Sequence, residues 1–257
     1  MLRICLLASG SKGNAIYLEC GETRLLVDAG LSARELAFRL AAIEVEAADL
    51  DAILVTHEHQ DHCRGLGPFA RRYRLPVFMH GGVREILPSL GSLDQHHEFA
   101  AGEPWVFRDL QVTAIPLTHD ALAPVGFVVE SAAGKVGVVT DLGIATRLVA
   151  DRMQGCRALV VEANHDEDML RDGPYPWPLK QRIRSNHGHL SNAAAADLLD
   201  GLLWEGLEGV FLAHLSETNN LPELARARCQ SVLDQQNQCR PDLVVGGPSR
   251  PSRCLKL

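Results

Sequence analysis

The segment Thr56–His62, THEHQDH, gathers three histidines and two acids in seven positions, directly after the apolar run DAILV. His57 and His59 are two residues apart, so on an extended strand end their side chains point the same way. Asp61 and His62 follow where the chain can turn and offer ligands to a second ion. Neutral imidazoles and carboxylates together suit zinc, iron or manganese better than calcium or magnesium. The segment therefore predicts a transition-metal site.

Three more polar residues end apolar runs further along the chain. His119 follows QVTAIPLT, Asp141 follows KVGVVT, and His214 follows GVFLA. Residues at the same ends of several strands can converge above one sheet edge, where a rigid scaffold holds them. A lone histidine is more often an ordinary surface or core residue, but this ordered series of strand ends favours metal binding.

The elements that must position these residues alternate along the chain. Short β-rich runs recur, and several are continuously apolar, as strands covered on both faces would be. Helical stretches lie between them. Ser32 and Glu35 form a capping box before one helix, Ser191 or Asn192 can cap another, and Pro222 suits the first turn of a third. The alternation predicts an α/β fold with helices outside its sheets.

Length and composition are compatible with one large domain or two small ones. Of the 257 residues, 46% are hydrophobic and no shift in composition marks a linker, which favours one sizeable core. The serine- and proline-rich end, residues 248–257, predicts a loosely ordered tail. No apolar run approaches the ~18 residues of a membrane span, and the first residues turn polar too quickly for a secretory signal.

Cysteines and charge bear on location and partners. Seven scattered cysteines without a CxxC pair indicate reduced thiols in a cytoplasmic protein. Cys63 adjoins the histidine motif, but we interpret it as a small buried apolar residue. The net charge of −7 means that the molecule as a whole lacks the excess of positive charge that favours binding of nucleic acid. A nuclease would need a local basic patch or metal ions to overcome it.

The ordered motifs resemble those of the metallo-β-lactamase superfamily, from Asp28 in LLVDAG to His214, and the match covers almost the whole chain. The resemblance implies a four-layer αββα metallo-β-lactamase sandwich, a hydrolase domain over residues 1–247 with its site at the sheet edge. It implies two divalent ions, one held by His57, His59 and His119 and the other by Asp61, His62 and His214, with Asp141 bridging them. Asp28 is implied to orient the metal loop; the alternative is a plain strand-end aspartate.

The metal site alone does not select a reaction. Two ions ~3.5–4 Å apart lower the pKa of a bridging water and stabilise charge on the attacked and departing oxygens, which suits phosphodiester, thioester and lactam hydrolysis alike. In the superfamily, aspartate at the bridging position is typical of phosphodiesterases and glyoxalase-II-like thioesterases, whereas lactamases usually carry cysteine. Asp141 therefore disfavours a lactamase.

A second pair of motifs, VVEANHDEDML and NHGHLSNAAAA, is similar to elements of transfer-RNA 3′-processing nucleases. That similarity implies that His189 protonates the leaving oxygen with Glu162 as its supporting carboxylate. A positioned general acid increases the rate of the reaction by roughly 10²–10⁴-fold. The alternative is a histidine that only caps a helix start. His187 fits no motif and is interpreted as a loop residue. The expected catalytic residues are thus Asp61, His189 and Glu162.

Three further segments, LLASGSKGNAIYL, GPYPWPLKQRIRSNHGHLSN and HLSETNN, resemble the YycJ (WalJ-like) family of bacterial single-domain metallo-hydrolases. The gaps on either side of Asp141 are too short for the arm of the transfer-RNA enzymes or the inserted domain of CPSF-type nucleases. The resemblance implies a 5′→3′ exonuclease that acts on DNA, with two manganese or zinc ions; His-rich sites of this kind also accept iron.

The proline-rich insert and the first glycine-rich turn supply candidates for substrate contact. Cationic side chains contact phosphates and aromatic side chains stack on bases. Arg184 and Trp177 supply a further cation and a further aromatic ring in the same insert. The candidate substrate-binding residues are Ser11, Asn14, Tyr175, Lys180, Arg182 and Asn192. The alternatives are a solvated loop with buried aromatics for the insert and an ordinary strand connector for residues 9–14. The basic cluster at 71–74 is more typical of a solvated helix end.

The leading hypothesis is a dinuclear-metal phosphodiesterase that trims DNA, rather than RNA, from its 5′ end. The alternative is a hydrolase of the same fold that acts on a cyclic or modified small phosphodiester or on a thioester. A metal-stabilised binding domain would require missing ligands, and every ligand of the motif set is present. No membrane partner is expected, and a homodimer remains an open alternative.

Overall fold

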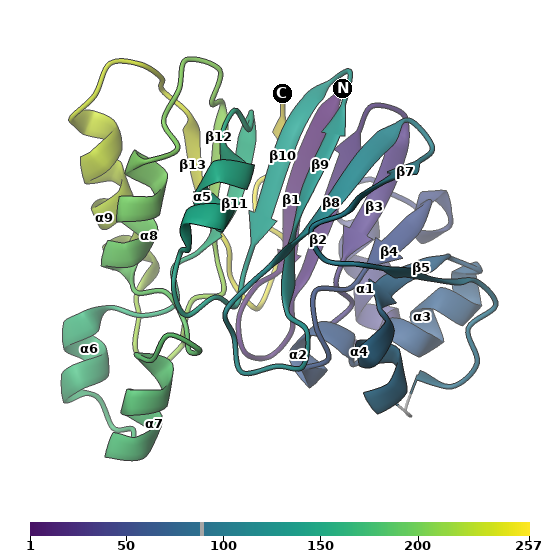
Figure 1. The fold of residues 1–257 in the computed structure, drawn as a ribbon, viewed down its shortest axis with the longest axis horizontal. Coiled ribbons are helices and arrows are strands. Elements are labelled where there is room, and N and C mark those ends of the chain that lie inside the picture. Colours follow the sequence, from purple (N-terminus) through teal and green to yellow (C-terminus); the bar gives the residue numbers. More distant parts are fainter. Residues whose placement is uncertain (88–89) are drawn as a thin grey trace.

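The computed structural model describes residues 1–87 and 90–257, and within them two mixed sheets of seven strands lie face to face (Figure 1). The first sheet has the order β14-β1-β2-β3-β4-β5-β6 and consists of β1 (Leu2–Ala8), β2 (Ala15–Cys20), β3 (Thr23–Val27), β4 (Ala52–Leu54), β5 (Val77–His80), β6 (His96–Phe99) and β14 (Leu255–Lys256). The second has the order β13-β12-β11-β10-β9-β8-β7 and consists of β7 (Pro104–Phe107), β8 (Leu110–Pro116), β9 (Val125–Ser131), β10 (Gly134–Val139), β11 (Ala158–Glu162), β12 (Gly209–Ala213) and β13 (Asp242–Val245).

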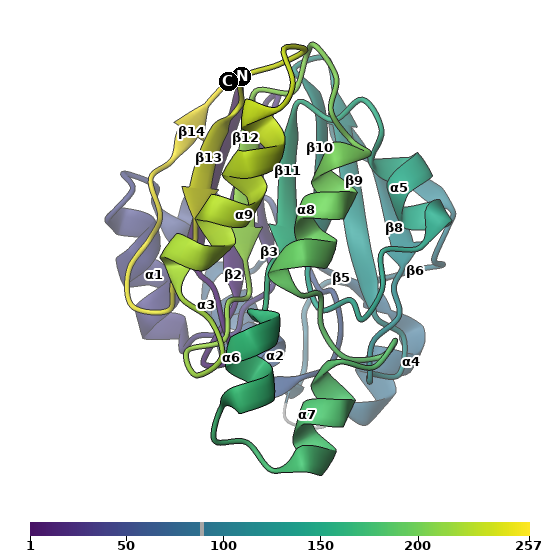
Figure 2. The ribbon, with the colours of Figure 1, turned by 90° about the vertical axis from the view of Figure 1, so that its left-hand side faces the viewer.

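Helices cover the outer face of each sheet. The first sheet is covered by α1 (Ala33–Ala41), α3 (Leu66–Tyr73) and α4 (Gly81–Ile86), and the second by α5 (Arg147–Met153), α8 (Asn192–Asp200) and α9 (Pro222–Asp234) (Figures 1 and 2). The remaining helices are η1 (Ala47–Asp49), α2 (Gln60–Cys63), α6 (Glu167–Asp172) and α7 (Trp177–Ile183). Helices α6 and α7 project from one end of the sandwich. The predicted αββα architecture is confirmed.

Strand β1 shows why the apolar runs are continuous. Leu2, Ile4 and Leu6 lie in the core between the two sheets. Cys5 and Leu7 face the other way and pack in the layer beneath α1 and α3. Both faces of the strand are therefore buried, so hydrophobic residues are required at every position rather than at every second one.

The helix starts follow their sequence signals. The Ser32 hydroxyl accepts a hydrogen bond from the Glu35 amide at 3.2 Å at the start of α1. Ser191, rather than Asn192, caps α8 by accepting from the Ala194 amide at 3.2 Å. Each cap satisfies an amide that the first helical turn leaves without a partner.

Two smaller expectations are also confirmed. Cys63 is buried, and its thiol donates to the His57 carbonyl. The basic cluster at 71–74 is the end of α3, with Arg74 in the left-handed conformation as its C-cap. Among the described helices, none combines the length and the apolarity that crossing a bilayer requires.

The expectation of a loosely ordered tail at 248–257 is wrong. Strand β14 pairs antiparallel with β1, with Ile4 opposite Leu255, and the Ser252 amide donates to the Leu6 carbonyl at 2.8 Å. The Leu255 side chain is only 4% exposed and belongs to the core between the sheets. The composition of the tail resembles a linker, but its last apolar residues close the edge of the first sheet.

We expect Leu255→Ala to lower the free energy of unfolding by about 2–5 kcal/mol, the usual effect of removing a buried leucine side chain. Urea denaturation followed by circular dichroism measures the change. Lys256→Ala is the matched control, because the neighbouring lysine is exposed and should change the free energy by less than about 0.5 kcal/mol. Equal stability of both variants would show that β14 does not hold the core.

Candidate metal centre

The candidate site lies where the strands of both sheets end. Asp28 directly follows β3, Asp141 lies just beyond β10, and His214 directly follows β12. All three take positive φ, at 62°, 59° and 56°, a conformation that non-glycine residues seldom adopt and that clusters at functional sites. The turn at each strand end therefore directs a polar side chain toward one region between the sheets.

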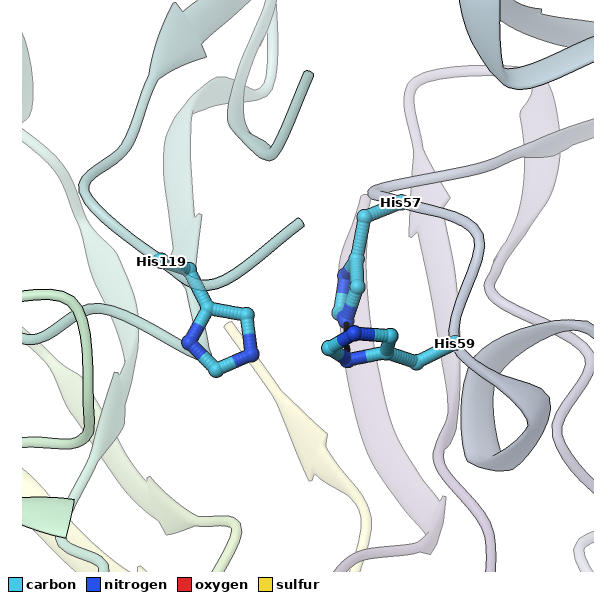
Figure 3. A group of neighbouring side chains, drawn as sticks. All are labelled: His57, His59 and His119. Carbon is cyan, nitrogen blue, oxygen red and sulfur yellow. Dashed lines mark hydrogen bonds between the residues drawn. The ribbon is translucent and has the colours of Figure 1, made fainter. Parts of the chain in front are cut away.

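The seven predicted metal ligands are brought together there. Figure 3 shows His57 and His59 from the loop after β4 facing His119 from the loop after β8. The ligand atoms of these three lie within 4.8 Å of one another, and so do those of a second group, Asp61, His62 and His214. The two groups coincide with the two ligand sets that the resemblance implied. Residues more than 150 positions apart thus meet as expected.

Asp28 and Thr56 orient the histidines of the first loop. The Asp28 carboxylate accepts hydrogen bonds from the Thr56 hydroxyl at 2.8 Å and from Nδ1 of His62 at 2.7 Å. The Thr56 hydroxyl in turn lies 2.9 Å from Nδ1 of His57. Because the hydroxyl proton points to Asp28, Nδ1 of His57 is the donor. Both imidazoles therefore present Nε2 to the site.

His119 and His214 are held in the same way from the second sheet. Nδ1 of His119 donates to the Gly188 carbonyl at 3.0 Å, and Nδ1 of His214 donates to Glu162 at 2.9 Å. Their Nε2 atoms point into the site. Four histidines thus engage Nδ1 in a hydrogen bond and direct Nε2 to the site, one of the arrangements in which an imidazole binds metal.

Asp141 lies between the two ligand groups. Its Oδ2 is 3.1 Å from Nε2 of His62, and its Oδ1 is 3.8 Å from Nε2 of His119. Among the described residues, the buried atoms Oδ2 of Asp141 and Nε2 of His214 have no hydrogen-bond partner. A buried polar atom without a partner is destabilising by about 1–3 kcal/mol, and a cation in contact with both would satisfy them. The donor set therefore fits divalent metal.

The buried setting shifts the pKa of several of these groups. Burial lowers the pKa of His57 and His119, which keeps both imidazoles neutral. Burial acts in the same direction on His214, but the nearby carboxylates of Asp141, Asp61 and Glu162 outweigh it and raise its pKa to about 10. A cation that binds this imidazole must displace its proton, so we expect metal binding to release protons.

Glu162 links the metal ligands to the predicted proton donor. Its Oε1 accepts from Nδ1 of His189 at 2.8 Å as well as from His214. Its Oε2 accepts from the backbone amides of Leu142 and Leu190 at 3.0 and 3.1 Å. Burial alone would raise the pKa of this carboxyl, but the two imidazoles lower it to about 2. Glu162 is therefore an ionised carboxylate that fixes His189 with Nε2 free.

A pocket of about 280 Å³ opens above these residues. Asp61, Asp141, His189 and His214 line it, together with three of the predicted substrate-binding residues, Ser11, Tyr175 and Arg182. Tyr175 precedes α7 and Arg182 lies within it, so the proline-rich insert forms one wall. The side chain of His189 is 20% exposed, which places the predicted proton donor in contact with whatever the pocket binds.

Lys180 and Asn192 do not reach the pocket, and their prediction as substrate contacts is wrong. The Lys180 ammonium turns inward and donates to the Arg171 carbonyl at 2.7 Å, tying α7 to α6. The Asn192 amide is buried and pairs with the Asn220 amide at 2.9 Å. Both polar groups are used in holding helices, so neither is free to contact a substrate.

Asn14 lies behind the ligands rather than in the pocket. Its Oδ1 accepts from the Gly10 amide at 2.9 Å, while its Nδ2 is 3.2 Å from Oδ2 of Asp61 and 3.0 Å from Nε2 of His62. The side chain is buried, so it does not meet substrate. Asn14 instead fixes the glycine-rich turn to two candidate ligands, which corrects its predicted role.

The structure adds pocket residues that the sequence did not indicate. Asn164, Ser216, Asp120 and His187 all line the pocket. Asn164 and His187 stood inside the motifs that pointed to Glu162 and His189, so those motifs were the available signal. Ser216 stood in the HLSETNN segment, whereas the only indication for Asp120 was its position directly after the candidate ligand His119.

The fold and the ligand arrangement define the class of protein. The family model of the Beta-lactamase superfamily domain matches residues 23–207, a range that holds six of the seven candidate ligands. The chain belongs to this superfamily, and it is a metal-dependent hydrolase.

Closer relatives narrow the family. The chain is 38% identical over 238 residues to exodeoxyribonuclease YycJ of Bacillus anthracis, with 91% of this chain and 90% of that one covered. It is 38% identical over 246 residues to exodeoxyribonuclease WalJ of Streptococcus pneumoniae, with 94% and 90% covered. The metallo-β-lactamase fold protein YhfI from Bacillus subtilis superposes over all of both chains with a TM-score of 0.76 at 15% identity, which concerns the fold alone. The chain is a YycJ/WalJ-like hydrolase.

Proposed function

We propose that the chain is a dinuclear-metal phosphodiesterase that degrades DNA exonucleolytically in the 5′→3′ direction in the cytoplasm. One observation carries the proposal: two groups of candidate ligands meet around Asp141, and His189, which lines the same pocket, is hydrogen-bonded to the buried Glu162. The identity to two exodeoxyribonucleases over nine-tenths of the chain supports DNA as the substrate.

The proposed roles follow the two ligand groups. One ion would be held by His57, His59 and His119 and the second by Asp61, His62 and His214, whose ligand atoms form two groups, and Asp141 would serve both. Zinc, manganese and iron all suit these donors. Bound divalent ions lower the pKa of water and stabilise charge on the oxygens of the reacting phosphate. Asp28 holds the first loop in place for them.

The residues of the chain supply the remaining steps. His189 gives a proton from Nε2 to the oxygen that leaves the phosphate, and Glu162 keeps the imidazole oriented through Nδ1. Asp61, which lines the pocket, would act both as a metal ligand and as a catalytic carboxylate. Ser11 and Arg182, which line the pocket, would contact phosphate oxygens, and Tyr175 would stack on a base.

A small-molecule phosphodiester or thioester is the alternative substrate. The net charge of −7 and the acidic side chain of Asp120 at the pocket favour it, because both repel a polyanion. This alternative predicts turnover of bis(p-nitrophenyl) phosphate or a thioester probe without salt-sensitive DNA binding.

We expect manganese or zinc to support release of labelled mononucleotide from 5′-end-labelled DNA from the first time point, and excess EDTA to abolish it. Metal analysis of the purified protein should find two ions per chain. RNA of the same sequence and 3′-labelled DNA serve as controls for substrate and direction. Internal fragments would indicate an endonuclease, early release of a 3′ label would reverse the direction, and no cleavage of any strand by metal-loaded protein would remove the proposal. Whether the chain forms a homodimer stays a prediction, and light scattering of the purified protein tests it.

A further inference from the structure

Two exposed ion pairs lie in the lining of the pocket or next to lining residues in the chain. Arg182 of α7 bonds Asp120, in the loop after β8, with 2.7 Å between Nη2 and Oδ2. Lys12 of the glycine-rich turn bonds Glu217, with 2.7 Å between Nζ and Oε2. Arg182 and Asp120 line the pocket themselves. Lys12 and Glu217 directly follow the lining residues Ser11 and Ser216.

Both pairs are open to solvent. The side chains of Arg182 and Asp120 are 61% and 56% exposed, and those of Lys12 and Glu217 are 74% and 41% exposed. Exposed pairs of this kind add little to folding stability, because water screens them and holding two long side chains loses entropy. A role in the fold therefore does not account for these two pairs. Weak pairing does make each carboxylate easy to displace by another oxyanion.

We propose that Asp120 and Glu217 are internal counterions that occupy the phosphate-binding positions of Arg182 and Lys12, and that a DNA strand binds by exchanging its phosphates for these carboxylates. The inference rests on the proposed function and names how the strand is recognised. A phosphate presents the same kind of oxygen acceptor as a carboxylate, so the exchange preserves the hydrogen bonds of each cation. A strand long enough to reach both pairs completes both exchanges at once.

The exchange accounts for DNA binding by a chain of net charge −7. Each displaced carboxylate stays beside the strand and opposes it, so binding is weaker and less dependent on salt than the two cations alone would make it. Neutralising a carboxylate should therefore strengthen binding. It should also steepen the plot of log affinity against log salt by about 0.7 for each cation released to a single strand.

The test uses Asp120→Asn, Glu217→Gln and the double variant, each metal-loaded and checked for metal content. Binding is measured by fluorescence anisotropy with a labelled single-stranded oligonucleotide whose phosphorothioate linkages slow cleavage, between 50 and 200 mM KCl. We expect each single variant to bind about two- to fivefold more tightly at the lowest salt, which corresponds to the free energy of an exposed ion pair. We also expect the steeper dependence of affinity on salt. Arg182→Gln and Lys12→Gln should bind more weakly with a shallower slope.

Asp242→Asn is the matched control. Asp242 pairs with Arg253 at 2.6 Å with 54% and 60% exposure, close to the values of the Asp120 pair, and it lines a different surface groove. It changes the net charge by the same amount and should alter neither affinity nor slope. Weaker or unchanged binding by Asp120→Asn and Glu217→Gln would overturn the inference. If the wild type bound and cleaved no oligonucleotide, the proposed function would fail; normal wild-type activity with unchanged variants would remove this inference alone.

Discussion

Asp141→Ala is expected to lose bound metal and to lower kcat/KM by more than about 10²-fold, beyond the 10–100-fold typical of residues that only support a ligand. Asp141 is the carboxylate that faces both ligand groups, with one oxygen toward His62 and the other toward His119. Its loss removes a candidate ligand from both proposed ions and one of the two buried carboxylates beside His62, of which Asp28 is the other. Metal content per chain, measured by elemental analysis after dialysis, is the direct readout.

The control for this prediction is Asp151→Ala. Asp151 lies on α5 and forms an exposed ion pair with Arg147, with 66% of its side chain accessible, so its removal should leave metal content and turnover within error of the wild type. Circular dichroism shows whether Asp141→Ala still folds. A folded Asp141→Ala protein that retained two ions per chain would contradict the bridging role, even if its activity were low.

The meeting of the candidate ligands was predictable because the signals that indicate it are local. Each ligand adjoins the end of an apolar run, and parallel strands of one sheet end at the same edge, so His119, Asp141 and His214 had to meet if the runs were strands. The HEHQDH loop carries four candidate ligands within six residues. Such a pattern can be recognised even where the exact bounds of a strand are uncertain. This is why the fold and the grouping of the candidate ligands in space agree with the prediction.

The proline-rich insert shows what could not be predicted from the sequence. Lys180 and Arg182 read as one basic run, but on a helix residues two positions apart face different directions. In α7, Lys180 therefore points inward to the Arg171 carbonyl, while Arg182 reaches the pocket and Asp120. Which of the two faces the substrate depends on how α7 is rotated against α6. That rotation is set by tertiary packing rather than by composition.

The tail and Asn14 were misjudged for a related reason. The pairing of β14 with β1 joins the two ends of the chain, and the contact of Asn14 with Asp61 joins a turn to a distant helix. Neither partner is visible in the local sequence. A short polar residue in a glycine-rich turn and an apolar pair after prolines each fit several environments equally well, so only the assembled sandwich decides between them.

His189→Ala is expected to lower kcat for DNA by about 10²–10⁴-fold while metal content stays at the wild-type level. The prediction separates two readings of the geometry, because His189 also lies within 4.8 Å of candidate ligand atoms of Asp141 and His214. Its Nδ1 is engaged by Glu162. If His189 were a ligand, the variant would lose metal; if it is a proton donor, the variant keeps metal and loses turnover.

The leaving group provides the sharper test of His189→Ala. An alkoxide leaving from DNA needs a proton in the transition state, whereas p-nitrophenolate departs without one, so the variant should lose far less activity on bis(p-nitrophenyl) phosphate than on DNA. His187→Ala is the matched control, because His187 lines the same pocket two residues earlier and has no contact with Glu162 among the described residues; we expect less than about a tenfold loss. An equal loss on both substrates by His189→Ala would mean that the imidazole acts on the site as a whole. The role of His189 would then be to hold Glu162 through the hydrogen bond from Nδ1. The proton for the leaving oxygen would have to come from water.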